Sequence, residues 1–330
     1  MRWLSASVGS HPYRLGGRCT TVSASGTHTM LTTFLDSLPP WGLFEAQVFN
    51  GLQQGMLLAL ISTGLTIIYG TLGVLNLAHG ALYTLGAYAG FVAYQATGSF
   101  LIAIAAGALC TLLIGLVIER GIIRYYYNRP DEDQIIVTFG LGIIIVESIR
   151  SYFGGGSQDM ATPSWGQGAS QLGFLDYPFP LYKIETIAIS AIVLLIFYLV
   201  LYRTRLGLVV RAGIEDSGMV SLLGINVFRA FFFVFAIGAM AAGLAGVING
   251  PITAPTPDGG EGFLVFSFVV VVLGGVGSFP GAIVGGLLAG QIMTLTSLFF
   301  PSLSEVMLYL AMALILIFRP RGLFGQAGRA

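Results

Sequence analysis

One stretch of the sequence restricts the possible folds more than any other feature: from Val48 to Ile118 there is no Asp, Glu, Lys or Arg. A helix needs about 20 apolar residues to span a bilayer, so this stretch can cross a membrane up to about three times. A second run, from Gly262 to Ser304, is also uncharged. Only 9% of all residues are charged, against roughly a quarter in soluble proteins. The chain is therefore predicted to be an integral membrane protein.

The apolar runs are continuous and do not alternate with polar residues, which argues against the strands of a membrane β-barrel. A helix satisfies its own backbone hydrogen bonds in lipid. We therefore predict an all-α fold, a polytopic transmembrane helical bundle with about eight or nine spans. The candidate spans are residues 48–69, 72–95, 99–119, 134–152, 185–202, 228–250, 263–276, 280–299 and 302–318. Gly and Pro interrupt or flank the second and seventh, so either is a candidate for a broken or re-entrant helix.

Arginines predict the orientation of the bundle. Ten of the fourteen lie in three segments, Arg120–Arg129, Arg203–Arg229 and Arg319–Arg329. An excess of Lys and Arg marks cytoplasmic loops, so these segments and the C-terminus are predicted to be cytoplasmic. The loop from Gly154 to Ile184 is then outside. This arrangement favours a full crossing by the seventh span.

The ends of the chain differ from the apolar region. Residues 1–40 are rich in Ser, Thr and Gly, and we expect a disordered N-terminal extension. One hypothesis is that Met30 is the natural start, and a transit peptide is a weaker alternative. Residues 41–325 form the predicted membrane domain, and residues 326–330 form a short C-terminal tail.

Composition and motifs exclude several classes of function. The formal net charge of zero argues against a nucleic-acid partner. Cys19 lies in the polar leader and Cys110 in an apolar span, so neither a disulfide framework, a metal site nor a cofactor is expected. We find no His-Glu-x-x-His or Gly-x-Ser-x-Gly motif, which argues against an enzyme. Glu147 and Arg150 are predicted to neutralise one another as an intrahelical pair rather than to relay protons.

The sequence offers no energy source of its own. Its one lysine, Lys183, is not part of a nucleotide-binding P-loop, so any ATP must be hydrolysed by another chain. Coupling to protons or sodium usually needs buried carboxylates, and the two long uncharged runs contain none. A passive channel and a subunit powered by other chains are the two options that this leaves open.

Glycines recur at four-residue spacing inside the apolar runs. Such pairs allow helix backbones to approach closely in a membrane, where the hydrophobic effect does not drive helices together. The chain has 46 glycines, so a single pair is weak evidence, but together the pairs predict a tightly packed bundle. The pairs are Gly51 with Gly55, Gly86 with Gly90, Gly281 with Gly285, and Gly286 with Gly290.

The stretch "GVLNLAHG", from Gly73 to Gly80, places two polar side chains in the first uncharged run. Polar groups at membrane depth are costly unless they face a partner or a water-filled path, so Asn76 and His79 are candidate functional residues. We place Tyr83 with them on a candidate substrate path. The alternative is structural: both polar side chains bond neighbouring helices or free carbonyls at a glycine-flanked helix break.

The predicted cytoplasmic segment from Arg211 reads "RAGIEDSGMVSLLGIN". Asp216 can cap a short helix, and Gly224 suits the left-handed position after its last turn. Met219, Leu222 and Leu223 fall on one face of this helix. Such a helix either lies on the membrane surface or docks its apolar residues into a groove of a cytoplasmic partner.

Four separated segments together resemble a known family: "GLTIIYGTLGVLNLAHGALYTLGAY", "DEDQIIVTFGLGIIIVESIRSYFG", "RAGIEDSGMVSLLGIN", and "LGGVGSFPGAIVGG" with "IFRPRGLFG". They resemble the permease subunits of branched-chain amino acid ABC importers, and the shorter of the two permease types more than the longer. The resemblance covers essentially Phe44 to Gly325.

The resemblance implies a multi-pass subunit of a bacterial inner membrane. It implies as partners a second related permease, two cytoplasmic ATP-binding subunits and a periplasmic or extracellular solute-binding protein. It makes residues 203–229 a cytoplasmic coupling segment. In this segment, the stretch from Arg211 to Asn226 is the coupling region for the ATPases, with Glu215 and Asp216 at its acidic start. Asp216 and Ser217 depart from the Glu-Ala-Ala pattern of many importers, so details of their docking pocket do not transfer. Urea and short amides are alternative solutes, and a passive channel for a small neutral solute is the alternative class.

Overall fold

The computed structural model describes residues 41–127, 129–170, 178–224 and 227–325, without the side chains of residues 214–218, 221 and 227. The expected N-terminal extension with Met30 and the expected tail at 326–330 lie outside this part of the chain. The helices are α2 (Trp41–Leu72), α3 (His79–Thr97), α4 (Phe100–Gly121), α5 (Asp131–Phe153), α6 (Leu181–Arg203), α7 (Arg205–Leu222), α8 (Val227–Thr253), α9 (Gly259–Gly274), α10 (Phe279–Phe299) and α11 (Ser304–Phe318).

The predicted all-α membrane bundle is confirmed, and each of the nine candidate spans corresponds to one helix. Among the described residues, seven helices are long and apolar enough to cross a membrane, and α9 is a shorter apolar helix. Between α5 and α6 the chain forms a short antiparallel ladder of β1 (Ala169–Ser170) and β2 (Phe179–Pro180). Three short 3₁₀ helices, Ile123–Tyr126, Ser164–Gly166 and Pro301–Leu303, complete the connections.

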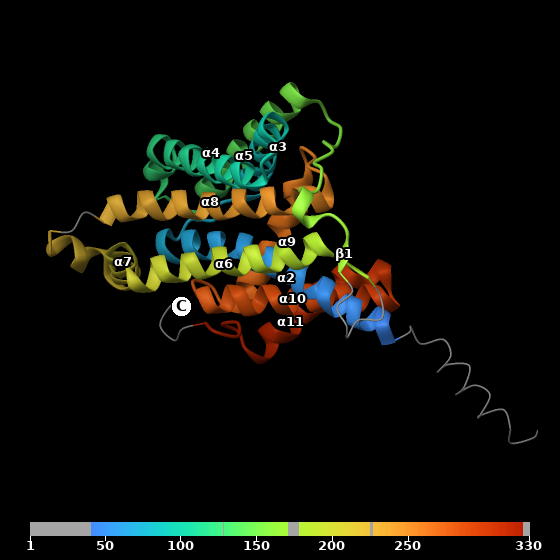
Figure 1. Ribbon diagram of the computed structural model, residues 1–330. Helices are drawn as coiled ribbons and strands as arrows, with labels where there is room; N and C mark the ends of the chain where they lie inside the picture. The colour runs from blue at the N-terminus through green and yellow to red at the C-terminus, as the bar shows by residue number, and fades with distance from the viewer. Residues whose placement is uncertain (1–40, 128, 171–177, 225–226, 326–330) are drawn as a thin grey trace, which may run out of the picture. The chain divides into compact units, whose positions relative to one another are not determined.

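Helix α2 forms the centre of the bundle. In its most apolar 18-residue window 94% of residues are buried, against 11% in α5 and 6% in the window that ends with α11. Figure 1 shows α2 between α6, α8 and α10, and all three pack against it. The exposed apolar surfaces of α5 and α11 are suited to contact with lipid or with another membrane subunit, since lipid tails solvate apolar side chains.

The glycine pairs lie where helices cross. A Cβ atom at Gly55 of α2 would lie 2.8 Å from the Cα of Leu287 in α10. A Cβ atom at Gly286 of α10 would lie 2.6 Å from the backbone nitrogen of Ala59 in α2. Gly86 faces α8 in the same way, and Gly281 and Gly285 face the end of α9. The backbones therefore approach more closely than any larger residue would allow, as the sequence predicted.

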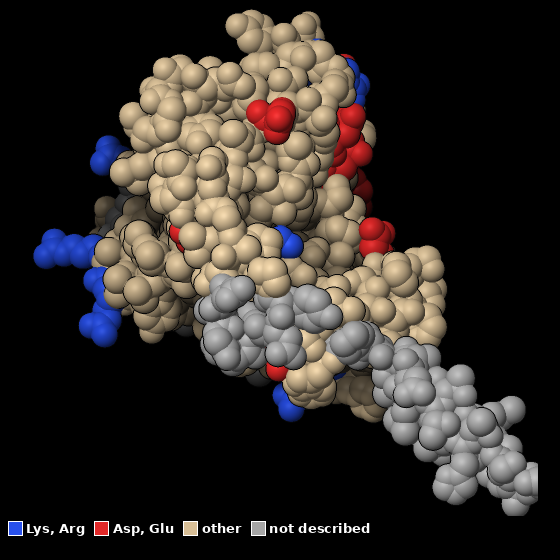
Figure 2. All heavy atoms as spheres, turned by 45° about the vertical axis from the view of Figure 1, so that its right-hand side comes forward, with Lys and Arg blue, Asp and Glu red and all other residues tan. Residues whose placement is uncertain are grey.

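The seventh predicted span corresponds to α9, which is shorter than the seven helices of membrane-spanning length. Asp258, the residue before α9, bonds Arg150 near the C-terminal end of α5. At the other end of α9, the Leu323 N–H donates to the Leu273 carbonyl at 2.9 Å, which holds the C-terminal segment beside the end of this helix. These contacts join the two ends of α9 to α5 and to the C-terminal segment. Figure 2 shows Lys and Arg gathered at the left edge and Asp and Glu mainly at the upper right.

Candidate functional site

The connection between α2 and α3 is a helix break. The sequence predicts a helix over 72–95, but α3 begins only at His79, because Gly73 adopts a φ of 69° and ends the preceding helix. The Asn76 side-chain oxygen then accepts the Ala78 N–H at 3.1 Å. The His79 N–H donates to the Asn76 carbonyl at 3.3 Å. Asn76 thus accepts hydrogen bonds from two backbone N–H groups at the start of α3.

A threonine of α5 holds this break from the side. The Thr138 hydroxyl accepts the Leu77 N–H at 3.1 Å and lies 3.1 Å from the Leu75 carbonyl, to which it can donate. Both backbone groups would otherwise lack a partner, because a break removes intrahelical bonds. The break is therefore specified by α5 as well as by its own sequence.

His79 ties the break to the central helix. Its Nε2 atom lies 2.9 Å from the Ile61 carbonyl in α2. A carbonyl can only accept, so Nε2 carries the proton. Both His79 and Asn76 are fully buried, and Nδ1 of His79 and Nδ2 of Asn76 have no hydrogen-bond partner among the described residues. These two atoms are therefore free to bond a water or solute that reaches the break.

Tyr83 lines a cavity of about 70 Å³ between α3, α8 and α9. The Asn249 amide of α8 donates to the Tyr83 hydroxyl at 2.7 Å, and the Tyr83 ring stacks on Phe263 with centroids 4.7 Å apart. Thr253 and Thr256 add hydroxyl groups to the same lining. The residues lining this cavity carry no charge, so it suits a neutral or zwitterionic solute.

Asn249 and Thr253 were not identified from the sequence. The argument that identified Asn76 also applies to Asn249, because a polar side chain in an apolar span is costly unless it has a partner or a function. The Asn249 amide also lies 3.3 Å from the Thr253 hydroxyl. The structure thus places Asn249 of α8 in contact with Tyr83 of α3.

The helix in the predicted cytoplasmic segment, α7, is longer than predicted. The sequence places its cap at Asp216, but α7 begins at Arg205, so Asp216 lies within the helix. The start is set by Thr204, whose hydroxyl accepts the Gly207 N–H at 3.3 Å as an N-cap does. The predicted C-terminal end is confirmed: α7 ends at Leu222, and Gly224 has a φ of 76°.

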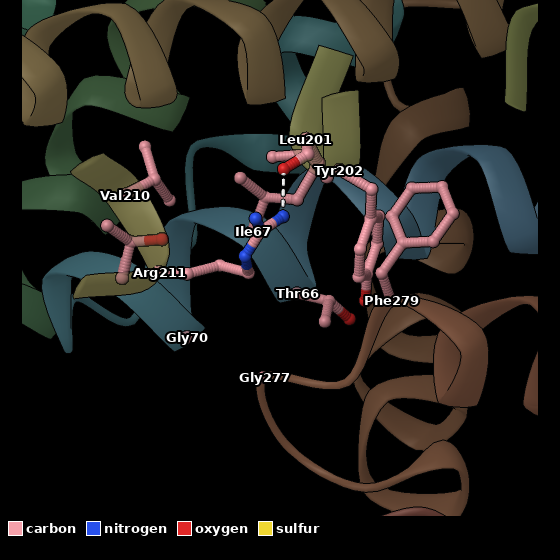
Figure 3. Close-up of a pocket in the computed structure, with 10 residues that line it drawn as sticks. Thr66, Ile67, Gly70, Leu201, Tyr202, Val210, Arg211, Gly277 and Phe279 are labelled. Carbon is pink, nitrogen blue, oxygen red and sulfur yellow. Dashed lines mark hydrogen bonds between the residues drawn. The ribbon is translucent and has the colours of Figure 1, made fainter. Parts of the chain in front are cut away.

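Arg211 attaches α7 to the bundle. Its guanidinium donates to the Leu201 carbonyl of α6 and lies 5.0 Å above the Tyr202 ring. Figure 3 shows these groups at a cavity of about 140 Å³ that also contacts α2, at Thr66 and Gly70 among others. One side of α7 is thus in direct contact with the end of the central helix.

The C-terminal end of α7 and the residue after it present apolar side chains. Met219, Leu222 and Leu223 are 57%, 84% and 72% exposed. These exposures agree with the predicted apolar face. The side chains of Glu215 and Asp216 lie outside the described part of the structure.

The predicted pair of Glu147 and Arg150 is confirmed, with 2.5 Å between Oε1 and Nη1. Arg150 also bonds Asp258, which joins α5 to the loop between α8 and α9. All three side chains are at least 39% exposed, so this network contributes little stability.

The family model described as the branched-chain amino acid transport system / permease component matches residues 47–318. The chain is 32% identical over 303 residues to the high-affinity branched-chain amino acid transport system permease protein LivH of Salmonella typhimurium, covering 86% of this chain and 96% of that protein. It is also 32% identical to the permease protein BraD of Pseudomonas aeruginosa, covering 85% and 95%. A more distant similarity, 26% identity covering 79% and 81%, is to the ribose import permease protein RbsC of Escherichia coli.

Proposed function

Because the chain belongs to the family of branched-chain amino acid transport system permease components, we propose that it forms the solute path for branched-chain or other small, largely neutral amino acids. It is a multi-pass membrane protein and a permease component of an ABC transporter. Its direction is import, across a bacterial inner membrane. The arginine-rich segments and the C-terminus lie on the cytoplasmic side.

The complete transporter contains a second related permease, two ATP-binding subunits and an external solute-binding protein. ATP is hydrolysed by those other chains. A P-loop needs a lysine, and the one lysine of the sequence, Lys183, is not part of a P-loop sequence and bonds Asn50 at 2.7 Å. This supports the assignment of ATP hydrolysis to other chains.

The solute path runs from the Tyr83 cavity past the helix break at Asn76 and His79. Hydroxyl and amide groups there can bond the ammonium or carboxylate of an amino acid, and the apolar surroundings suit an aliphatic side chain. The two unpaired atoms, Asn76 Nδ2 and His79 Nδ1, offer one donor and one acceptor at the break.

The observation that carries the coupling mechanism is the contact of α7 with α6 and α2. A motion of the ATPases that displaces Leu222 and Leu223 moves a helix whose Arg211 is bonded to the end of α6. The same movement reshapes the 140 Å³ cavity against α2. The residues assigned to coupling are Arg211, Glu215, Asp216, Met219, Leu222, Leu223 and Gly224.

The coupling assignment is tested in the reconstituted transporter by substrate-stimulated ATP hydrolysis. Asp216→Arg and Leu222→Arg are expected to abolish stimulation by loaded binding protein, because bulky cations replace the acidic start and an apolar contact. Leu208→Arg is the matched control: Leu208 is 60% exposed on the same helix but precedes the region from Arg211 to Asn226, to which the ATPase contact is assigned. Stimulation that survives Asp216→Arg and Leu222→Arg would contradict the assignment.

The solute class is tested separately with the cognate solute-binding protein. A titration with leucine, isoleucine, valine, urea, short amides and ribose is expected to give tightest binding for an aliphatic amino acid. If the binding protein prefers urea, an amide or a sugar, the proposed path carries that solute instead. Solute flux through the isolated chain in vesicles, without ATP, would favour the passive channel.

A further inference from the structure

A cavity of about 460 Å³ lies between the C-terminal end of α4 and the N-terminal end of α8, apart from the solute path. Three arginines line it: Arg120, Arg124 and Arg229. The one carboxylate in the lining is Glu119, so the formal charge is 3 − 1 = +2. Three guanidinium groups around one cavity indicate an anionic ligand, because each offers several donors in a planar fork that matches phosphate oxygens.

The carboxylate does not oppose such a ligand strongly. Glu119 is 1% exposed, and its Oε1 atom accepts the Tyr127 hydroxyl proton at 2.6 Å. Burial and this bond raise the pKa of Tyr127, so the hydroxyl remains a donor. The arginines, in contrast, are exposed. The surface that a ligand meets is therefore cationic, with the carboxylate buried and already bonded.

Aromatic side chains form the rest of the lining. Phe228 and Phe233 are 51% and 48% exposed, and Phe232 lies between them in the same wall. The Arg124 guanidinium lies 5.6 Å from the centre of the Phe228 ring, and Tyr127 stacks on that ring at 6.3 Å. Exposed phenylalanines beside arginines suit a ligand that is charged at one end and apolar at the other.

An exposed apolar stripe on α4 leads to this cavity. Leu109, Leu113 and Val117 are 57%, 50% and 67% exposed at four-residue spacing, so they form one stripe along the helix. The stripe ends one turn before the first arginine of the cavity. Apolar surface that continues into a basic pocket matches a lipid, whose acyl chains lie in the bilayer and whose headgroup lies at its surface.

We propose that this cavity binds the phosphate headgroup of an anionic phospholipid of the cytoplasmic leaflet. Arg120, Arg124 and Arg229 hold the phosphate, and the acyl chains lie on the α4 stripe and the exposed phenylalanines. A free phosphate would satisfy the arginines but would leave the apolar surfaces without a partner. The α4–α8 cavity is therefore a lipid site.

The test measures lipid binding to the full purified chain in detergent by native mass spectrometry. Dioctanoyl phosphatidylglycerol is titrated against dioctanoyl phosphatidylcholine, and inorganic phosphate is added as a competitor. Phosphatidylglycerol is expected to bind more tightly, and phosphate at millimolar concentration is expected not to displace it. Arg124→Gln should weaken phosphatidylglycerol binding about fivefold, and Arg120→Gln with Arg124→Gln about 25-fold.

Arg319→Gln is the matched control, because Arg319 is exposed at the end of α11 and does not line the cavity. It is expected to leave both lipid affinities unchanged. Arg124→Lys keeps the charge and should lose less than Arg124→Gln, which provides a second test if the double variant does not fold. Equal binding of the two lipids, an equal loss in Arg319→Gln, or full competition by phosphate would overturn the proposal. A loss of subunit assembly with unchanged lipid affinity would also overturn it and identify a protein interface.

Discussion

Replacing Gly by Ala is predicted to have opposite effects on stability at two positions. It should destabilise the fold at Gly286, where α10 is in close contact with α2, and should not do so at Gly140 in α5. In Gly286→Ala the new Cβ atom would lie 2.6 Å from the backbone nitrogen and 2.7 Å from the Cα of Ala59. Carbon atoms in contact lie about 3.5–4.0 Å apart, so the helices must separate by roughly 0.8 Å at this point. Both neighbouring atoms belong to the backbone, so no side-chain rotation relieves the contact.

The matched control is Gly140→Ala in α5. A Cβ atom there has no neighbour within 4 Å, and the residue is half-buried. Both variants gain the same helix propensity of about 0.5–1 kcal/mol for replacing Gly by Ala. Only Gly286→Ala is overpacked, which costs about 1–3 kcal/mol. The unfolding free energies of the two variants should therefore differ by about 1–3 kcal/mol, with Gly140→Ala at least as stable as the parent chain.

The measurement is SDS-induced unfolding of the purified full chain in mixed micelles, followed by tryptophan fluorescence. Both variants are compared with the parent at equal detergent concentration. The argument from backbone proximity is refuted if Gly286→Ala and Gly140→Ala unfold within about 0.5 kcal/mol of one another, since the two sites then pack alike.

Three further substitutions test the candidate path. Thr138→Val should lower the unfolding free energy by about 1 kcal/mol, because it leaves two part-buried backbone groups at the break unpaired. Thr138→Ser should keep near-parental stability in the same assay. Tyr83→Phe removes the acceptor for the Asn249 amide and keeps the ring, so transport assays should show a KM raised about threefold to tenfold with normal assembly. His79→Ala removes the bond to the Ile61 carbonyl, worth about 0.6 kcal/mol in a membrane, and leaves a void. Reduced folding yield or transport is expected, and a variant that assembles and transports normally would contradict both roles considered for His79.

Much of the fold follows from the sequence, because membrane insertion depends on long apolar runs that need no tertiary contact to be recognised. The predicted spans lie within a few residues of the helices, with two exceptions. Helix α2 begins at Trp41, before the predicted start at residue 48, and Gly73 displaced the start of α3 to His79. The start of α7 was also misplaced, because Thr204 caps the helix well before Asp216. A polar residue in a cytoplasmic segment can cap a helix or lie inside it, and the sequence gives no means of choosing.

The sequence by itself determined the membrane class, the number of arginine-rich loops, the glycine positions where helices meet and the polar residues of the break. The tertiary structure decided what those residues contact. Nothing near Thr138 marks it as the partner of the break, and nothing near Tyr83 indicates that Asn249 reaches it from α8. Local properties such as hydropathy and backbone freedom depend on short stretches of sequence. Hydrogen bonds between distant helices depend on which faces meet, and only packing of the whole bundle determines that.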